Sequence, residues 1–227
     1  MSGGLWLGIE TSGRGGGVAL VRDDGVVVEH LLPVVADTSE KVLPAVRDAM
    51  ESANASPGDL EGIGVSLGPG SYTGLRIGAA TALGLSRGWG VGVAGVPTLE
   101  VLAAGTGLRG TVLTAVEARR GEVFASAYRV AAGPRPEELF PAAAYTAGAV
   151  REWAERARPA AAVGTGRRQL GELGGAWVPP ILDSPRPAAV AALARDRAGR
   201  SGFDDHLEPL YLRGFMGRAL LEVRPRA

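Results

Sequence analysis

Two glutamates, Glu10 and Glu117, occupy corresponding places in two similar stretches of the chain. Residues 7–21 read LGIETSGRGGGVALV and residues 113–128 read LTAVEARRGEVFASAY. Each stretch is therefore an apolar strand, a glutamate, a polar turn and a second strand. Carboxylates at strand ends can hold Mg²⁺ and orient a water molecule for attack on a phosphate. The plainer interpretation is a hydrogen-bonded turn acid, and we favour it because the glycine-rich segment at 164–166 is short for a nucleotide site. The candidate nucleotide-site residues are Glu10, Thr11, Ser12, Glu117 and Arg119.

A second pattern, GVSLG at residues 64–68, matches the G-x-S-x-G turn that presents a nucleophilic serine in hydrolases. Asp183 or Asp196 and then His206 follow in the chain order that such enzymes use. In those enzymes the helix begins directly after the serine, whereas here a Gly-Pro-Gly loop comes first. We therefore expect Ser66 to be a strand-end residue rather than a nucleophile.

A glycine-rich loop and two groups of arginines are further features that could bind phosphate groups. The glycine-rich loop at 68–74 precedes a helix, but no Gly-Lys-Ser/Thr follows, so a sharp strand-to-helix connection is the simpler interpretation. Arginines in the second half of the chain could contact RNA phosphates. The first group alternates with glutamates and reads as a solvated helix face, which leaves the tail group as the better RNA candidate. The first group is Arg151, Arg156, Arg158, Arg167 and Arg168, and the tail group is Arg213, Arg218, Arg224 and Arg226.

The composition excludes several classes of function. There are 24 basic and 24 acidic residues, so no overall charge attracts nucleic acid. The chain has no cysteine and 2 histidines, which argues against disulfides, thiolate chemistry and a histidine-built metal centre. No apolar run reaches membrane-spanning length, and the N-terminus lacks a secretory signal pattern. We expect a soluble, cytoplasmic chain with no metal and no cofactor.

The elements that must position these residues follow an α/β order. Three sequential antiparallel strands are followed by helix, strand, helix and strand, which predicts a mixed, ribonuclease-H-like sheet covered by helices. The same scheme restarts near Thr111, so we expect a two-lobed, actin-like (ASKHA) α/β fold. The predicted N-terminal lobe covers residues 1–104. The second lobe, smaller and degenerate, covers residues 105–227 and includes a helix at 187–198, with the C-terminal tail packing back on the first lobe.

The predicted helix that begins near Thr73 has an unusual face. Small residues recur at four-residue spacing, and an interior glycine costs a helix about 1 kcal/mol relative to alanine. A face with almost no side chains lets another backbone come close, either from the same chain or from a partner. The residues of this face are Gly74, Gly78, Ala82 and Ser86.

The central stretch SLGPGSYTGLRIGAATALGLSRGWGVGVAGVPTLEVLA resembles the signature of the TsaB (YeaZ) family. Further similar segments are IETS near the start, SEKVLP at 39–44, VEARRGEVF at 116–124 and EPLYLR at 208–213. Together they span nearly the whole chain, while residues 130–200 match only loosely.

This resemblance implies a degenerate actin-like subunit without catalytic residues of its own. Members of the family support TsaD, the metal-holding transferase that makes threonylcarbamoyladenosine beside the anticodon of tRNA, and the ATPase TsaE completes the bacterial system. The transferase binds its metal through a His-x-x-x-His pair in its first helix, and residues 38–44 here contain no histidine. The resemblance also implies a homodimer when the chain is alone, and tRNA contact through the complex. The alternative is an active actin-like ATPase or kinase that uses Glu10 and Glu117.

The resemblance places the contact with TsaD on the first two helices. We expect the bare helix face to form it, together with aliphatic side chains of the preceding helix, while the competing interpretation is that the glycines pack on their own sheet. On the first interpretation, Gly78→Leu or Ala82→Trp would abolish pairing and leave the monomer folded. The expected partner or dimer interface is Val42, Val46, Met50, Gly74, Gly78 and Ala82.

Overall fold

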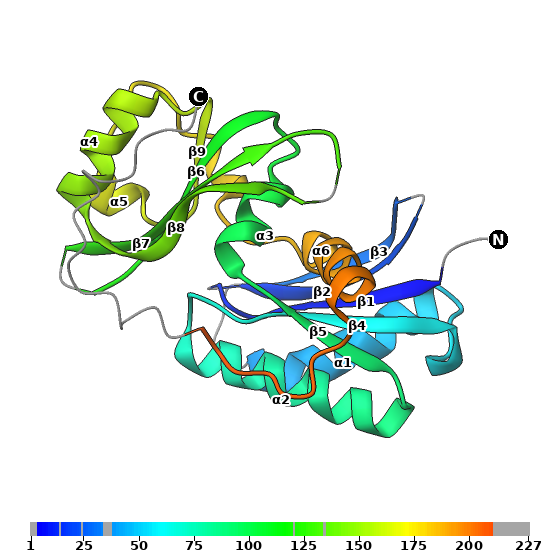
Figure 1. Cartoon of the computed structure of the whole chain (residues 1–227). Helices are drawn as coiled ribbons and strands as arrows, with labels where there is room; N and C mark the ends of the chain where they lie inside the picture. The colour runs from blue at the N-terminus through cyan, green and yellow to red at the C-terminus, as the bar shows by residue number, and fades with distance from the viewer. Residues whose placement is uncertain are drawn as a thin grey trace. The chain divides into compact units, whose positions relative to one another are not determined.

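The computed structural model describes residues 4–13, 15–23, 25–33, 38–119, 121–133 and 135–210. The described chain forms two compact units (Figure 1). Residues 4–101 and 185–210 form unit 1, and residues 102–184 form unit 2. Within the described residues, no helix is long and apolar enough to cross a membrane.

Unit 1 is built on a five-stranded sheet in the order β3-β2-β1-β4-β5. β2 pairs antiparallel with β1 and β3, whereas β4 runs parallel to both β1 and β5. The sequential antiparallel strands and the later parallel strands are those that the sequence predicts. The strands are β1 (Leu5–Glu10), β2 (Gly16–Arg22), β3 (Gly25–Leu32), β4 (Leu60–Ser66) and β5 (Gly92–Val96).

Helices cover both faces of this sheet (Figure 1). On one face lie α1 (Thr38–Ser52) and α2 (Tyr72–Trp89), whose apolar sides bury the core formed with Leu7, Ile9 and Ile63. Ser71 caps the N-terminus of α2, because its side chain accepts a hydrogen bond from the Gly74 amide at 3.2 Å. On the other face lies α6 (Pro187–Ser201). The 3₁₀ turn Pro57–Asp59 precedes β4.

Unit 2 repeats the topology of unit 1 in reduced form. Its four strands follow the order β8-β7-β6-β9, in which β7 is antiparallel to β6 and β8, and β9 is parallel to β6. This repetition confirms the two-lobed, actin-like α/β class predicted from the duplicated strand–turn–strand pattern. The helix α3 (Thr98–Gly105) begins in unit 1 and ends in unit 2. The other elements of unit 2 are β6 (Gly110–Glu117), β7 (Glu122–Val130), β8 (Glu137–Thr146), α4 (Ala147–Ala157), β9 (Ala161–Val163), α5 (Arg167–Leu170) and the 3₁₀ turn Pro180–Leu182.

The domain boundary differs from the predicted one, because residues 185–210 belong to unit 1 rather than to the second lobe. Glycines explain why α6 packs on the first sheet. A Cβ at Gly8 would lie 2.2 Å from the Pro187 carbonyl oxygen, and one at Gly64 would lie 2.6 Å from the Ala194 Cβ. A side chain at either strand position would therefore displace the helix.

Polar contacts complete the attachment of this C-terminal segment to unit 1. Glu29 on β3 accepts a hydrogen bond from the Ala188 amide at 3.1 Å and pairs with Arg186, so it caps the N-terminus of α6. The Asp204 amide donates to the Val93 carbonyl at 2.8 Å, and its carboxylate accepts from the Gly95 amide at 2.7 Å.

Candidate functional site

The turn after β1 holds the first group of candidate residues, and Glu10 lies at its centre. Only 1% of Glu10 is exposed. Its Oε1 accepts hydrogen bonds from the Ser12 amide and the Ser12 hydroxyl, both at 2.5 Å. Its Oε2 is also buried and has no hydrogen-bond partner among the described residues. The side chain thus closes on its own turn and presents no carboxylate oxygen to solvent.

Burial raises the pKa of the Glu10 carboxyl above its ordinary value, because it removes the solvation of the charged form. The hydrogen bonds from Ser12 act in the opposite direction and are the weaker influence. The nearby Ser66 hydroxyl also acts to lower this pKa, although it makes no hydrogen bond of ordinary geometry. Glu10 is therefore biased toward the neutral acid, which is a poor ligand for a cation.

The next two residues of the turn hold the first turns of α2. The Thr11 hydroxyl donates to the Gly74 carbonyl at 2.8 Å, and the Ser71 amide donates to the Ser12 carbonyl at 2.8 Å. The turn after β1 comes so close to α2 that a Cβ at Gly74 would lie 2.0 Å from the Thr11 carbonyl oxygen. A Cβ at Gly78 would lie 2.3 Å from the Thr11 hydroxyl oxygen. The glycines of α2 are required by the approach of the β1 turn.

The packing of α2 against the β1 turn shows that the predicted interface is wrong, because its residues are buried within unit 1. Gly74, Gly78 and Ala82 are buried against their own sheet, as the competing interpretation held. Their three companions on α1 are buried in the same core. The physical reason is that the small face of α2 receives the β1 turn, so it leaves no surface for a second polypeptide. The buried companions are Val42, Val46 and Met50.

The opposite face of α2 is the one exposed to solvent. Tyr72 is 55% exposed, with the Arg76 guanidinium 4.1 Å from the centre of its ring. Ala80 and Gly84 continue this face at four-residue spacing, and a Cβ at Gly84 would meet nothing within 4 Å. On the neighbouring α1, Leu43 is 51% exposed. We call this surface the outer face of α1 and α2, and it comprises Leu43, Pro44, Tyr72, Arg76, Ala80 and Gly84.

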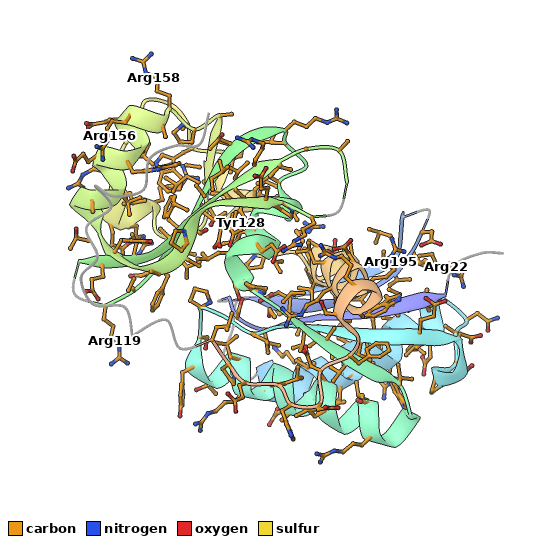
Figure 2. All side chains as sticks on the ribbon, viewed as in Figure 1. Arg22, Arg119, Tyr128, Arg156, Arg158 and Arg195 are labelled. Atoms are coloured by element: carbon orange, nitrogen blue, oxygen red, sulfur yellow. The ribbon has the colours of Figure 1, made fainter. Side chains whose placement is uncertain are left out.

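In unit 2, Glu117 is the last residue of β6 and Arg119 follows two positions later, and both are exposed. Figure 2 shows the Arg119 side chain extending away from the ribbon. The Glu117 amide donates to the Thr165 hydroxyl at 3.1 Å, which ties β6 to the short glycine segment. The environments of the two glutamates differ, because Glu10 is sealed inside unit 1 while Glu117 lies at the surface of unit 2.

The hydrolase pattern is not supported by the structure. Ser66 is fully buried at the end of β4, so its hydroxyl is closed to an external substrate. Asp183 pairs with Arg167 at 3.2 Å and accepts from the Gly164 amide at 2.9 Å. The glycine loop after β4 is likewise packed rather than open, since the Gly70 backbone lies against Ser12. The sequence analysis did not predict this role of Asp183, whose carboxylate holds the loop after β9 through Gly164 and Arg167.

Among the described residues of unit 2, several arginines pair with acids rather than forming one basic surface. Arg156 pairs with Glu152 at 3.5 Å, and Arg167 is held by Asp183 and stacks on the Trp177 ring at 4.5 Å. Figure 2 shows Arg156 and Arg158 at the outer end of α4.

A cavity of about 480 Å³ lies beside that end of α4, but its lining balances Arg151 and Arg158 with Glu155 and Glu172. The predicted tail cluster of arginines lies outside the described residues. In the part of the chain that the structure describes, no group of three or more His, Asp or Glu side chains is arranged to hold a metal ion.

Comparisons with known proteins agree with the fold. The family model described as TsaD, tRNA N6-adenosine threonylcarbamoyltransferase, matches residues 31–155. The chain is 30% identical to the tRNA threonylcarbamoyladenosine biosynthesis protein TsaB of Escherichia coli (strain K12), over 91% of this chain and 94% of that protein. It is 37% identical to TsaB of Bacillus subtilis (strain 168), over 54% of each chain.

A solved structure, YeaZ from Pseudomonas aeruginosa, superposes with a TM-score of 0.78 at 23% identity and covers 92% of this chain and all of that one. This likeness concerns the fold. The match to the Escherichia coli protein extends over nearly the full length of both chains and agrees with the predicted family. The chain belongs to the TsaB (YeaZ) family.

Proposed function

We propose that this chain is a non-catalytic subunit that binds TsaD and supports the transfer of the threonylcarbamoyl group to tRNA. The observation that carries the proposal is the burial of Glu10, the strand-end acid that an actin-like ATPase would use. With 1% of the residue exposed and Oε1 held by Ser12, this carboxyl is in no position to bind Mg²⁺ or orient water. The absence of histidine in α1 also supports it, because the transferase resemblance places a His-x-x-x-His metal pair there.

The docking surface in this proposal is the outer face of α1 and α2. It combines an exposed tyrosine and arginine with an exposed leucine and two small residues of α2, Ala80 and Gly84. Tyrosine and arginine are the residue types that most often dominate binding energy at interfaces, and small residues let two helices approach closely. The same surface would pair two copies of the chain when TsaD is absent. TsaE is a further member of the assembly, and tRNA binds to the complex as a whole.

A reconstituted reaction with TsaD, TsaE, tRNA and the threonylcarbamoyl donor tests the non-catalytic role. The double variant Glu10→Gln, Glu117→Gln is expected to support product formation at the wild-type rate, because neither carboxylate takes part in chemistry. Omission of the chain should abolish product. A folded double variant that binds TsaD normally but gives no product would contradict the proposal.

The alternative function is an active ATPase or kinase that uses Glu10 and Glu117. The observation that favours it is the exposure of Glu117 at the surface of unit 2. ATP turnover by the isolated chain, lost in Glu117→Gln, would establish that alternative.

A further inference from the structure

Within the described residues, Glu10 is the only acidic or basic side chain that is buried. The hydrogen bonds to its carboxyl are unequal. Oε1 accepts two from Ser12, while Oε2, which is also shielded from solvent, has none. Buried polar atoms in folded proteins are almost always hydrogen-bonded, so the unpaired Oε2 calls for an explanation.

A second unpaired atom lies on the neighbouring strand. β1 and β4 are parallel with Ile9 opposite Val65, so the next residues, Glu10 and Ser66, lie side by side with their side chains on the same face. Ser66 is fully buried, and its Oγ has no hydrogen-bond partner in the described structure. An ionised Oε2 can only accept a hydrogen bond, which the Ser66 hydroxyl would donate, whereas a protonated carboxyl can itself donate to Ser66 Oγ. The charges around the carboxyl decide between these two arrangements.

Among the residues that the structure describes, the groups placed against this carboxyl carry no charge. They are Ser12 and Gly13 of its own turn and Ser66 of β4. On the same face of the sheet, α6 presents Pro187 and Ala191 to the neighbouring Gly8. Arg186, which precedes α6, is paired with Glu29. A buried carboxylate without a cationic partner is strongly disfavoured, and the group takes up a proton instead.

We propose that Glu10 is a neutral carboxylic acid at pH 7 and that its Oε2–H donates a hydrogen bond to Ser66 Oγ. This bond joins the ends of β1 and β4. The Ser12 bonds to Oε1 fold the turn back on the same carboxyl, and Thr11 and Ser12 hold the first turns of α2. The proton on Glu10 is thus a structural part of the turn that positions α2.

Infrared spectroscopy of the full-length chain tests this directly. At pH 7 the folded wild-type protein should show the C=O stretching band of one protonated carboxyl, and Glu10→Gln should abolish it. Glu117→Gln, which changes the exposed glutamate at the matching strand end, should leave the band in place. Ser66→Ala should keep the band but shift its frequency, because the acceptor of the Oε2–H bond is removed.

Unfolding the wild-type chain in denaturant at pH 7 provides a test that needs no variant. The band should disappear on unfolding, since water then solvates the carboxylate. A folded wild-type protein without a protonated-carboxyl band at pH 7 would overturn the inference, and so would a band that survives Glu10→Gln. Both measurements use the isolated chain, so their outcome is independent of whether it binds TsaD.

Discussion

At the scale of single residues, the glycines of α2 divide into two kinds. Gly74 and Gly78 face the β1 turn, where an added Cβ would meet Thr11 within 2.3 Å. Gly84 and Gly88 face solvent, where a Cβ would meet nothing within 4 Å. All four lie in one helix, so they share the same cost in helix propensity and differ only in their surroundings. Their substitutions should therefore have opposite effects on stability.

Gly78→Ala should lower the free energy of unfolding by about 1–3 kcal/mol, because the new methyl displaces the Thr11 hydroxyl from its bond to Gly74. Gly84→Ala is the matched control and should raise it by up to about 1 kcal/mol, through helix propensity alone. Urea denaturation of the two variants measures the difference. Equal effects of the two substitutions would contradict the assigned packing of α2.

Glu10 should make the stability of the chain depend on pH. Burial raises its folded-state pKa above the ordinary value of about 4.5, so folding takes up a proton at this carboxyl. The stabilising contribution is complete below the unfolded value and is lost as pH rises through the higher folded value. Glu10→Gln has no such proton to lose. As the pH is raised from 4 to 8, the difference in free energy of unfolding should therefore shift in favour of Glu10→Gln. Denaturant titrations at several pH values test this, and a difference between the two proteins that stays constant with pH would contradict it.

At the scale of elements, α6 is the helix whose placement could not be predicted. The sequence predicts an alanine-rich helix at 187–198, close to the observed α6 (Pro187–Ser201). Nothing in its local pattern shows which sheet it covers, because it is separated from β1 by the whole of unit 2. The available signal was the pair of glycines at Gly8 and Gly64, which lie on one face of adjacent strands and leave space for a helix backbone.

Gly64→Ala should loosen α6 from the sheet. Its Cβ would lie 2.6 Å from the Ala194 Cβ and 2.9 Å from the Val190 carbonyl oxygen, so the helix must move outward. We expect a loss of about 1–3 kcal/mol in stability and faster amide hydrogen exchange in residues 187–201 than in α1 or α2. Gly199→Ala lies in α6 itself with nothing within 4 Å of its Cβ, and it should leave exchange unchanged or slower. Unaltered exchange in Gly64→Ala would argue against the close packing of α6.

At the scale of the whole molecule, the repeated strand–turn–strand pattern correctly predicted two similar sheets, because strand order follows from local hairpins and helical crossovers. The family, predicted from the signature that surrounds α2, is likewise confirmed. The predicted interface failed for a physical reason. A stripe of small residues shows where a close approach occurs, but the same stripe serves a partner or the chain's own backbone equally well. Only the contact of Thr11 with Gly74 decides between them.

Calorimetric titration of purified TsaD into the wild-type chain, Gly84→Arg and Gly199→Arg tests the central claim most directly. Both variants replace an exposed helical glycine whose Cβ would meet nothing within 4 Å, so both monomers should fold. Gly84→Arg places a bulky cation on the outer face of α1 and α2 and should weaken binding at least about tenfold, equivalent to about 1.4 kcal/mol. Gly199→Arg should bind as wild type does. Undiminished affinity of Gly84→Arg, or no binding of TsaD by the wild-type chain, would contradict the proposed docking role.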